Sequence, residues 1–600
     1  MNKVLSFAAV FFFSQCYFSQ EKPIDEVVVQ GKLLSLPMKK VSENVEIITK
    51  EDIKNAPANT VEDLLSFYTG IDIRKRGAGD MQGDISIRGG SFEQVLLLLN
   101  GIRMNDPQTG HNMMNIPVSL ENIEKIEIVK GPSSRKFGQN AYSGVVNIIT
   151  KPAATDQYTA SGTIGDFKTW SLGASANFGN QEFRNLLSVN YAESAGYRHN
   201  TDYTTPSVWY QNQLKTKNGV LKMQAGFVQK KFGANGFYAS PTATEQYEET
   251  QTSVASLTSI ENLNENLQLT SNLYWRRAQD MYLFIRDNPG YYRNMHIGNN
   301  YGGEMNLKYQ SQFGVSGLGV EAHQEDLRSS NLGARGRFVT QISAEHHFSL
   351  LQNKLTVNPG LSWINYTGTG NFFYPGLDVG YSIDDQNKIY ANVAKVHRVP
   401  TYTDLYYRSM VEEGNPDLKP ENALSYELGY QLDLASFLFK TSVFAKDSKN
   451  GIDWVRNAAD TKWVAENISN LKTKGVEVEM SKKLETWVKE VSVGYTYLDS
   501  QSSNNENGQN SRYALENLKH QMNAKLRLGY WKLGADVVYQ YNERLVLGSY
   551  QLLDAKLYYT SKAFDAFLLV NNITNTQYTG ASLVPMPKRW FQVGVTYRLK

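Results

Sequence analysis

Residues 522–540 read MNAKLRLGYWKLGADVVYQ, and their side chains alternate in character. Apolar Ala524 and Leu526 are each followed by a charged residue, Lys525 and Arg527. Because successive side chains of a strand point to opposite faces, this period of two predicts strands with one apolar and one polar face. A face that carries full charges is more solvated than a soluble core accepts, so the stretch favours a membrane barrel over a soluble sandwich.

The same alternation recurs from about residue 155 to the end of the chain. Further examples are residues 267–275, 491–497 and 590–599. Tyr and Trp occupy the ends of such segments, as in the aromatic girdles of membrane barrels. Connections range from the tight turn at Asn218-Gly219 to a polar loop at 499–511. Short turns on one side and long loops on the other are typical of outer-membrane barrels.

Strand number follows from length. A membrane strand with its connection takes about 20 residues, so the region after residue 154 predicts roughly 22 antiparallel strands. A barrel of that size encloses a wide lumen that needs a plug. The fold class expected is therefore an all-β membrane barrel, filled by a small α/β domain from the N-terminal part of the chain.

Composition excludes several classes of protein. The 61 basic and 59 acidic residues nearly cancel, which leaves no field that would collect nucleic acid. No HExxH, GxSxG, phosphate-binding loop or paired-cysteine motif is present, and the pair His346-His347 lies within alternating strand sequence. We therefore predict no catalytic residue, no metal site and no cofactor, and the chain is not expected to be an enzyme.

The N-terminus has the layout of an export signal. Lys3 precedes an apolar run at residues 4–13, which is too short to span a bilayer, and cleavage is expected near residue 20. Cys16 is the single cysteine; a lipoprotein site there would want a small residue where Gln15 stands. An exported chain without apolar runs of membrane-helix length is periplasmic, secreted or a β-barrel.

Between residues 45 and 152 the pattern changes. Thr60 and Asp63 resemble a capping box ahead of an amphipathic helix that Gly70 stops. Strands are predicted at residues 85–87, 95–99, 126–129 and 145–149, with Asn100-Gly101 as a turn between two of them. These segments predict the small mixed domain that the barrel needs.

Taken in order, these segments resemble the TonB-dependent outer-membrane receptors along essentially the whole mature chain. The matching stretches are 25–31 (DEVVVQG, like the Ton box), 86–90 (SIRGG), 95–101, 126–132 (IEIVKGP), 137–150 (FGQNAYSGVVNIIT), 398–401 (RVPT), 414–421 (GNPDLKPE) and 571–575 (NNITN). The resemblance implies a signal peptide at 1–20, Ton box and linker at 21–44, plug at 45–152 and barrel at 153–600, in a monomer of the bacterial outer membrane.

The resemblance also implies energised uptake, with the inner-membrane protein TonB as partner. The TonB-binding residues would be Asp25, Glu26, Val27, Val28, Val29 and Gln30. Physically, a Val-rich strand near a free terminus can add to the edge of another protein's sheet; the alternative is an ordinary buried plug strand. A passive porin would lack the Ton box and plug, and an outer-membrane enzyme would need a catalytic set in its lumen or loops.

The segment 105–115, NDPQTGHNMMN, lies where the family has its substrate-facing plug apex. The candidate ligand-binding residues are Asn105, Gln108, His111, Asn112, Met113 and Met114, which offer amide, imidazole and thioether groups with little charge. This composition suits a large neutral ligand or one of mixed polarity. The alternative for this segment is a loop that packs the plug against the barrel.

Length and plug pattern are most similar to the cobalamin-transporter branch, which implies a cobalamin-like nutrient. A haem receptor is the second candidate, with His111 as a possible axial ligand, and a ferric-siderophore receptor is open too. Two departures stand out. The calcium-binding acidic loops of some cobalamin receptors are not recognisable, and the chain ends in Leu599-Lys600 where the family commonly ends in an aromatic residue.

Charged plug residues have two interpretations. Arg88 and Lys130, with acidic Glu93, Glu124 and Glu127 nearby in the sequence, could form ion pairs between plug and barrel wall or could be solvated surface charges. Three glycines near them, at 131, 138 and 144, are expected to serve turns and close approaches only.

Overall fold

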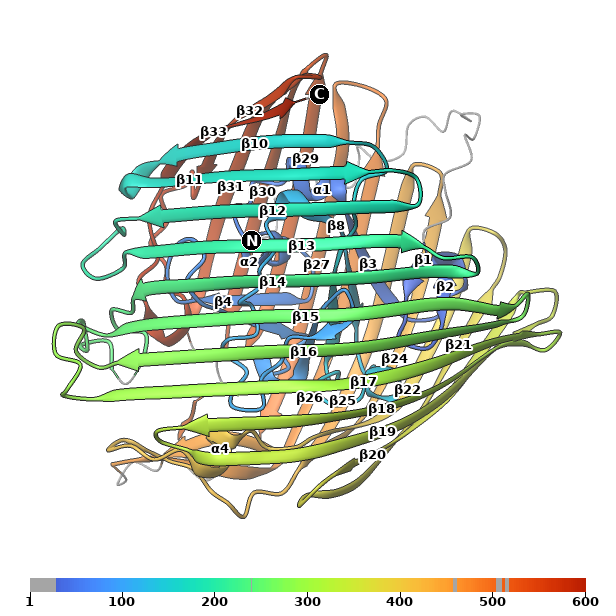
Figure 1. Ribbon diagram of the computed structural model, residues 1–600, viewed down its shortest axis with the longest axis horizontal. Helices are drawn as coiled ribbons and strands as arrows, with labels where there is room; N and C mark the ends of the chain where they lie inside the picture. Colours follow the sequence, from blue (N-terminus) through green and yellow to red (C-terminus); the bar gives the residue numbers. More distant parts are fainter. Residues whose placement is uncertain are drawn as a thin grey trace, which may run out of the picture.

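The computed structural model describes residues 28–238, 240–456, 461–502, 510–512, 517–545 and 547–599. A ring of long strands encloses the N-terminal segments, which are blue in Figure 1. The predicted signal peptide, Cys16, the Ton-box residues Asp25 to Val27 and the terminal Lys600 lie outside the described residues. Within the described residues, no helix has the length and apolar character needed to cross a membrane.

The ring is a closed barrel, as the alternation predicted. Leaving aside the two-residue strands β23 and β28, 22 antiparallel strands close it among the described residues, and β10 pairs with β33. The strands are β10 (Gln157–Gly165), β11 (Thr169–Gly179), β12 (Phe183–Ser194), β13 (Tyr203–Lys215), β14 (Gly219–Gly233), β15 (Tyr247–Asn264), β16 (Leu267–Leu283), β17 (Arg293–Ser311), β18 (Gly314–Ser329), β19 (Gly333–Leu350), β20 (Leu355–Tyr366), β21 (Gly370–Ser382), β22 (Asn387–Arg398), β23 (Glu412–Glu413), β24 (Glu421–Leu434), β25 (Phe437–Arg456), β26 (Trp463–Lys483), β27 (Val488–Ser502), β28 (Asn510–Ser511), β29 (Leu518–Tyr530), β30 (Leu533–Arg544), β31 (Gly548–Thr560), β32 (Phe564–Asn571) and β33 (Trp590–Leu599).

The two faces of each strand differ as the sequence predicted. Apolar Leu526 and Val593 are exposed on the outside of the barrel, where lipid would cover them. Charged side chains turn inward onto the plug: Lys525 lies 3.2 Å from the centre of the Tyr68 ring, and Arg527 pairs with Asp52 at 3.1 Å. The charges that excluded a soluble sandwich therefore line a lumen that a second domain fills.

The two ends of the barrel also differ. Turns such as those between β15 and β16 or β29 and β30 are only two residues long, and they share one end with the chain termini of the barrel. Long connections, among them residues 399–420 with helix α4 (Tyr402–Tyr406), lie at the other end. The same asymmetry is found in outer-membrane barrels, which have short turns on the periplasmic side and long loops outside.

The plug is a mixed α/β domain inside the barrel. Its elements are β3 (Asn44–Thr49), α1 (Lys50–Asn55), α2 (Val61–Ser66), β4 (Ile71–Lys75), β5 (Gly83–Ile87), β6 (Val95–Leu99), β7 (Ile102–Arg103), β8 (Ile123–Lys130), α3 (Ser134–Phe137) and β9 (Gly144–Thr150). A five-stranded sheet has the order β3-β8-β9-β6-β7, and β4 pairs with β5 separately. All four predicted plug strands are present within these elements.

Two local predictions meet different outcomes. The capping box is confirmed, because the Asp63 N–H donates to Thr60 Oγ1 at 3.1 Å and the Asp63 side chain accepts from the Thr60 N–H at 3.2 Å. Asn100-Gly101 is indeed a turn, with φ of 50° and 86°. It joins β6 to the short strand β7, however, and not to another of the predicted strands, because a two-residue turn brings back only the chain that follows it directly.

Buried ion pairs hold the plug against the wall. Arg88 donates to Glu427 at 2.9 Å and to Glu477 at 2.8 Å, and these side chains are at most 5% exposed. Lys130 pairs with Glu479 of β26. The interpretation of Arg88 and Lys130 as plug-to-wall pairs is therefore confirmed.

The three acidic residues named with Arg88 and Lys130 have different kinds of ion-pair partner. Glu93 reaches Arg398 at the end of wall strand β22. Glu124 pairs with exposed Lys50, and Glu127 with Lys125, both within the plug. Only Glu93 therefore belongs to the plug-to-wall pairs, because β8 directs Glu124 toward solvent and Glu127 toward the N-terminal segment.

The Arg88 cluster generates a stability prediction. Replacing Arg88 by Met leaves two buried carboxylates without their cation, and should cost about 3–5 kcal/mol of plug stability. Hydrogen–deuterium exchange of β4 and β5 measures this cost as faster exchange. Adding Glu427→Gln and Glu477→Gln should recover part of the loss, while Arg589→Met at an exposed site should have no effect. Wild-type exchange in Arg88→Met would contradict the proposed cost.

Candidate ligand-binding site

The candidate ligand site is a cavity of about 680 Å³ between the plug and the long-loop end of the barrel. Plug residues near Phe92 and His111 form its floor, and residues from α4, β16, β17 and β25 form its walls. Small-molecule sites are typically concave spaces of several hundred cubic ångströms lined by aromatic groups with a few polar ones, so size and position both suit a ligand.

His111 is fixed at the floor of this cavity. Its ring stacks on Phe92 with centroids 4.3 Å apart, and its Nδ1 lies 2.9 Å from Asp84 Oδ1. Arg76 binds the other oxygen of Asp84 at 2.7 Å. Burial opposes ionisation of Asp84, but Arg76 and His111 outweigh it and lower the pKa of this carboxyl to about 2. The predicted site residue is thus held by an ionised carboxylate.

The plug apex is also joined to a barrel loop. The backbone N–H groups of Tyr402 and Thr403, at the start of α4, donate to the carbonyls of Pro107 and Gln108 at 2.9 and 3.0 Å. The Gln108 amide reaches Asp280 of β16 at 3.5 Å, and Gln108 and Asn112 both line the cavity. The structure therefore brings the apex and two barrel segments together around one space.

Three of the predicted ligand residues, Asn105, Met113 and Met114, do not line this cavity. Met113 and Met114 are buried in the plug core, at 0% and 2% exposure. Asn105 accepts from the Leu97 N–H at 3.0 Å and donates to the Val95 carbonyl at 2.8 Å, so it completes the edge of β6. A thioether and an amide suit a ligand or a core equally well, and composition alone could not distinguish the two.

The prediction from sequence missed the barrel's contribution. Arg398 is 1% exposed; it donates to Glu421 at 2.8 Å, lies 3.3 Å from Asp404, and also pairs with Glu93 of the plug. Burial raises the pKa of Glu93 above its usual range; Arg398 opposes this shift, and Asp404 and Glu421 add to it. Arg398 and Glu421 stand in the two barrel motifs quoted from the sequence, but nothing local showed that they meet.

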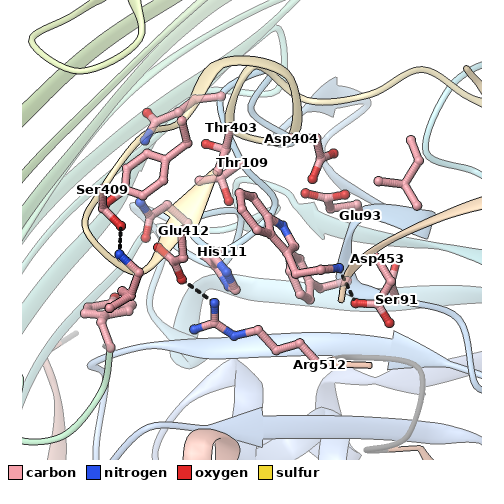
Figure 2. A pocket seen from close by; sticks show the side chains of 18 of the residues that line it. Ser91, Glu93, Thr109, His111, Thr403, Asp404, Ser409, Glu412, Asp453 and Arg512 are labelled. Atoms are coloured by element: carbon pink, nitrogen blue, oxygen red, sulfur yellow. Dashed lines mark hydrogen bonds and ion pairs between the residues drawn. The ribbon is translucent and has the colours of Figure 1, made fainter. Parts of the chain in front are cut away.

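Aromatic rings cover another wall. Tyr282 makes edge contacts with Tyr238 and Tyr292, with ring centroids 5.5 and 6.3 Å apart, and Phe284 stacks on Tyr291. Arg512, which also lines the cavity, pairs with Glu412, as the dashed line in Figure 2 shows. The cavity thus combines flat apolar surface with charged groups.

At the short-turn end, the described part of the predicted Ton box forms a strand. β1 (Val28–Gln30) pairs with β2 (Ser35–Pro37) in a separate two-stranded sheet, at the right of Figure 1. The Gln30 N–H donates to the Glu127 carboxylate at 3.0 Å. Lys32 binds Glu304 at 3.2 Å and also Glu321, on wall strands β17 and β18. The segment is therefore tied to both plug and wall.

Within the part of the chain that the structure describes, no group of three or more His, Cys, Asp or Glu side chains has the arrangement of a metal site.

The Asp84 contact gives a prediction with a defined pH dependence. Because the pKa of Asp84 is lower in the folded protein than its unfolded value near 4, its stabilisation is present above about pH 4 and is lost as pH falls toward 2. Asp84→Asn should therefore cost about 2 kcal/mol at neutral pH, seen as roughly 30-fold faster hydrogen exchange in residues 105–115.

Two controls accompany the Asp84→Asn prediction, namely a variant at an exposed site and the pH dependence of the melting temperature. Asp287→Asn, in the β16–β17 connection, should exchange like wild type. The melting temperature of wild type should fall more steeply between about pH 4 and about pH 2 than that of Asp84→Asn. Equal slopes with unchanged exchange would show that Asp84 does not hold the apex.

Comparisons with known proteins agree with this architecture. Residues 126–573 match the model of the TonB dependent receptor-like β-barrel, and residues 37–145 match the TonB-dependent receptor plug domain. The vitamin B12 transporter BtuB of Vibrio vulnificus is 25% identical, with 96% of this chain and 95% of that protein aligned. BtuB of Photobacterium profundum is 22% identical over 98% of this chain and 97% of its own length.

A solved structure shares the fold. The ferric enterobactin receptor of Pseudomonas aeruginosa superposes with a TM-score of 0.76 at 18% identity, covering 93% of this chain and 100% of that one. Because the barrel model matches well over half of the residues and the plug model accounts for the domain inside it, the chain belongs to the family of TonB-dependent receptors.

Proposed function

We propose that the protein takes up a large, scarce nutrient, cobalamin-like in kind, across the bacterial outer membrane with energy from TonB. The observation that carries the proposal is that two sides of the same plug carry different features. The plug's outer face forms the floor of a cavity, and its inner side holds a short separate strand near the chain's N-terminus. Catalysis has no part in this function.

Vitamin B12 is the first ligand to test, because the BtuB relatives align with this chain nearly end to end. The enterobactin receptor shares the fold at a lower sequence identity. This similarity does not favour enterobactin as the ligand of the present protein. The haem alternative rests on His111, whose ring lies on the cavity floor. Selective loss of haem binding in His111→Ala would favour haem over cobalamin.

Energy coupling is assigned to the N-terminal segment, Asp25 to Gln30. Among the described residues, its strand β1 pairs only with β2, so it can leave without breaking the five-stranded plug sheet. A released strand can add to the sheet edge of TonB through main-chain hydrogen bonds. The apolar outer face of the barrel fits membrane lipid, and a closed barrel that contains its own plug needs no second copy.

The coupling assignment predicts the phenotype of Val28→Pro. Proline removes a main-chain donor and disfavours an added strand, so uptake should fall to the level of a strain without TonB while surface binding of the ligand persists. Uptake and binding of labelled vitamin B12 by whole cells measure both quantities. Val28→Ile keeps the strand and should transport normally. Full uptake by Val28→Pro would place the coupling strand elsewhere.

The ligand site predicts the effect of Gln108→Ala combined with Asn112→Ala. Loss of two amide groups from the cavity floor should weaken binding by about 30-fold, because each hydrogen bond contributes about 1 kcal/mol. Equilibrium binding to the purified protein measures it, and heat-modifiable migration on gels checks folding. Asn266→Ala with Gln312→Ala, in short turns at the opposite end, is the matched control. Equal affinity in both double variants would reduce the apex to a packing loop.

A further inference from the structure

The outer cavity has an excess of acidic groups. Among the described residues that line it, seven carry a carboxyl group, Arg512 is the single arginine, and lysine is missing. Arg512 is already paired with Glu412. The other carboxyl groups must therefore be balanced by the lining histidines His111 and His296, from behind the cavity wall, by a bound ligand, or by protons.

The positive charge behind the cavity wall does not fully balance these carboxyl groups. Arg398 is surrounded by Glu93, Asp404 and Glu421, all three of which line the cavity. One guanidinium compensates one carboxylate. Even if Glu93 keeps a proton, this cluster therefore retains at least one negative charge next to the ligand space.

A second acidic cluster lies across the cavity. Glu248 of β15 and Asp280 of β16 both line the cavity, and the register of the two strands makes them diagonal neighbours, so two carboxyl groups share this wall. Tyr238 and Gln108 contribute neutral donors, to Glu248 and Asp280 respectively. Within the described residues, neither carboxyl forms an ion pair with a Lys or Arg side chain.

The same surface is rich in aromatic rings. Tyr238, Tyr282 and Tyr292 form a continuous edge-to-face row, and Trp454 lies beside Asp453 on another wall. Aromatic faces attract cations and apolar ring systems, whereas they offer nothing to a compact anion. Carboxylates and aromatic faces together form a surface complementary to an uncharged or cationic solute with a broad apolar face.

We propose that this cavity selects ligands by charge: it takes large uncharged or cationic solutes with an extended apolar face and rejects polyanionic metal chelates. The proposal rests on the proposed function in one respect, namely that this cavity is the ligand site, and it narrows the substrate class within it. It favours an uncharged corrinoid such as vitamin B12 over a trianionic ferric catecholate.

Four probes of graded charge test the rule on the full-length protein in detergent. They are vitamin B12, which is uncharged; its singly hydrolysed monocarboxylate; the monocationic ferric complex of a linear trihydroxamate; and trianionic ferric enterobactin. We expect the uncharged and cationic probes to bind. The monocarboxylate should bind at least fivefold more weakly than vitamin B12, and ferric enterobactin should not bind at matched concentration. Added salt should reduce the penalty on the monocarboxylate.

Variants locate the source of the selectivity. Glu248→Gln with Asp280→Asn removes the charge of one cluster without changing side-chain size, and should shrink the difference between vitamin B12 and its monocarboxylate severalfold. Glu265→Gln, in the exposed β15–β16 turn, removes a charge at the opposite end and should leave the difference unchanged. Heat-modifiable migration confirms that each variant is folded.

The possible outcomes distinguish the proposed charge selectivity from the proposal that the ligand is cobalamin-like. Binding of the cationic chelate without vitamin B12 would refute the cobalamin assignment and support the charge rule. Tightest binding of ferric enterobactin, or equal affinity for vitamin B12 and its monocarboxylate, would overturn the charge rule even if uptake is TonB-dependent. Failure of all four probes to bind would overturn both.

Discussion

Ion pairs buried between plug and wall are the constraint on which the rest of the structure depends. Arg88, Lys130 and Arg135 of the plug each meet a wall carboxylate, and wall Arg544 binds plug Asp72 through two bonds of 2.7 Å. Buried pairs add little net stability because desolvation offsets their attraction, yet breaking one partner is costly. The plug is therefore held in one orientation by contacts that water can replace once it enters.

An apolar interface of the same extent would behave differently. Its separation would expose hydrocarbon to water over the whole contact, at about 25 cal/mol for each square ångström, whereas separated charges recover their hydration. A polar interface thus suits a plug that must be seated uniquely and also rearrange. It likewise explains the inward charges of Lys525 and Arg527, which first distinguished this chain from a soluble sandwich.

Whether a feature can be predicted from the sequence depends on how far apart in the chain the residues that form it lie. Strand alternation, the Thr60–Asp63 capping box and the Asn100-Gly101 turn are set by neighbours a few residues apart, and all three could be predicted. In the cluster around Arg398, the pair of Arg398 with Glu93 joins residues 305 positions apart, so no local pattern reveals it. The burial of Met113 and Met114 in the plug core could not be predicted for a related reason: the sequence does not show what surrounds an apolar side chain once the fold is formed.

The N-terminal segment shows how a strand can be held and still be released. In the part of the chain that the structure describes, β1 pairs only with β2, so its removal breaks a short hairpin and leaves the strand pairing of the plug sheet intact. Leu33 and Leu34 fit against Gly317 and Gly319 of β18, where any Cβ would collide with them. Lys32 adds its pairs with two wall carboxylates. A pull on this segment must therefore break contacts with the plug sheet, made by Val29 and Gln30, as well as the wall contacts of residues 32–34.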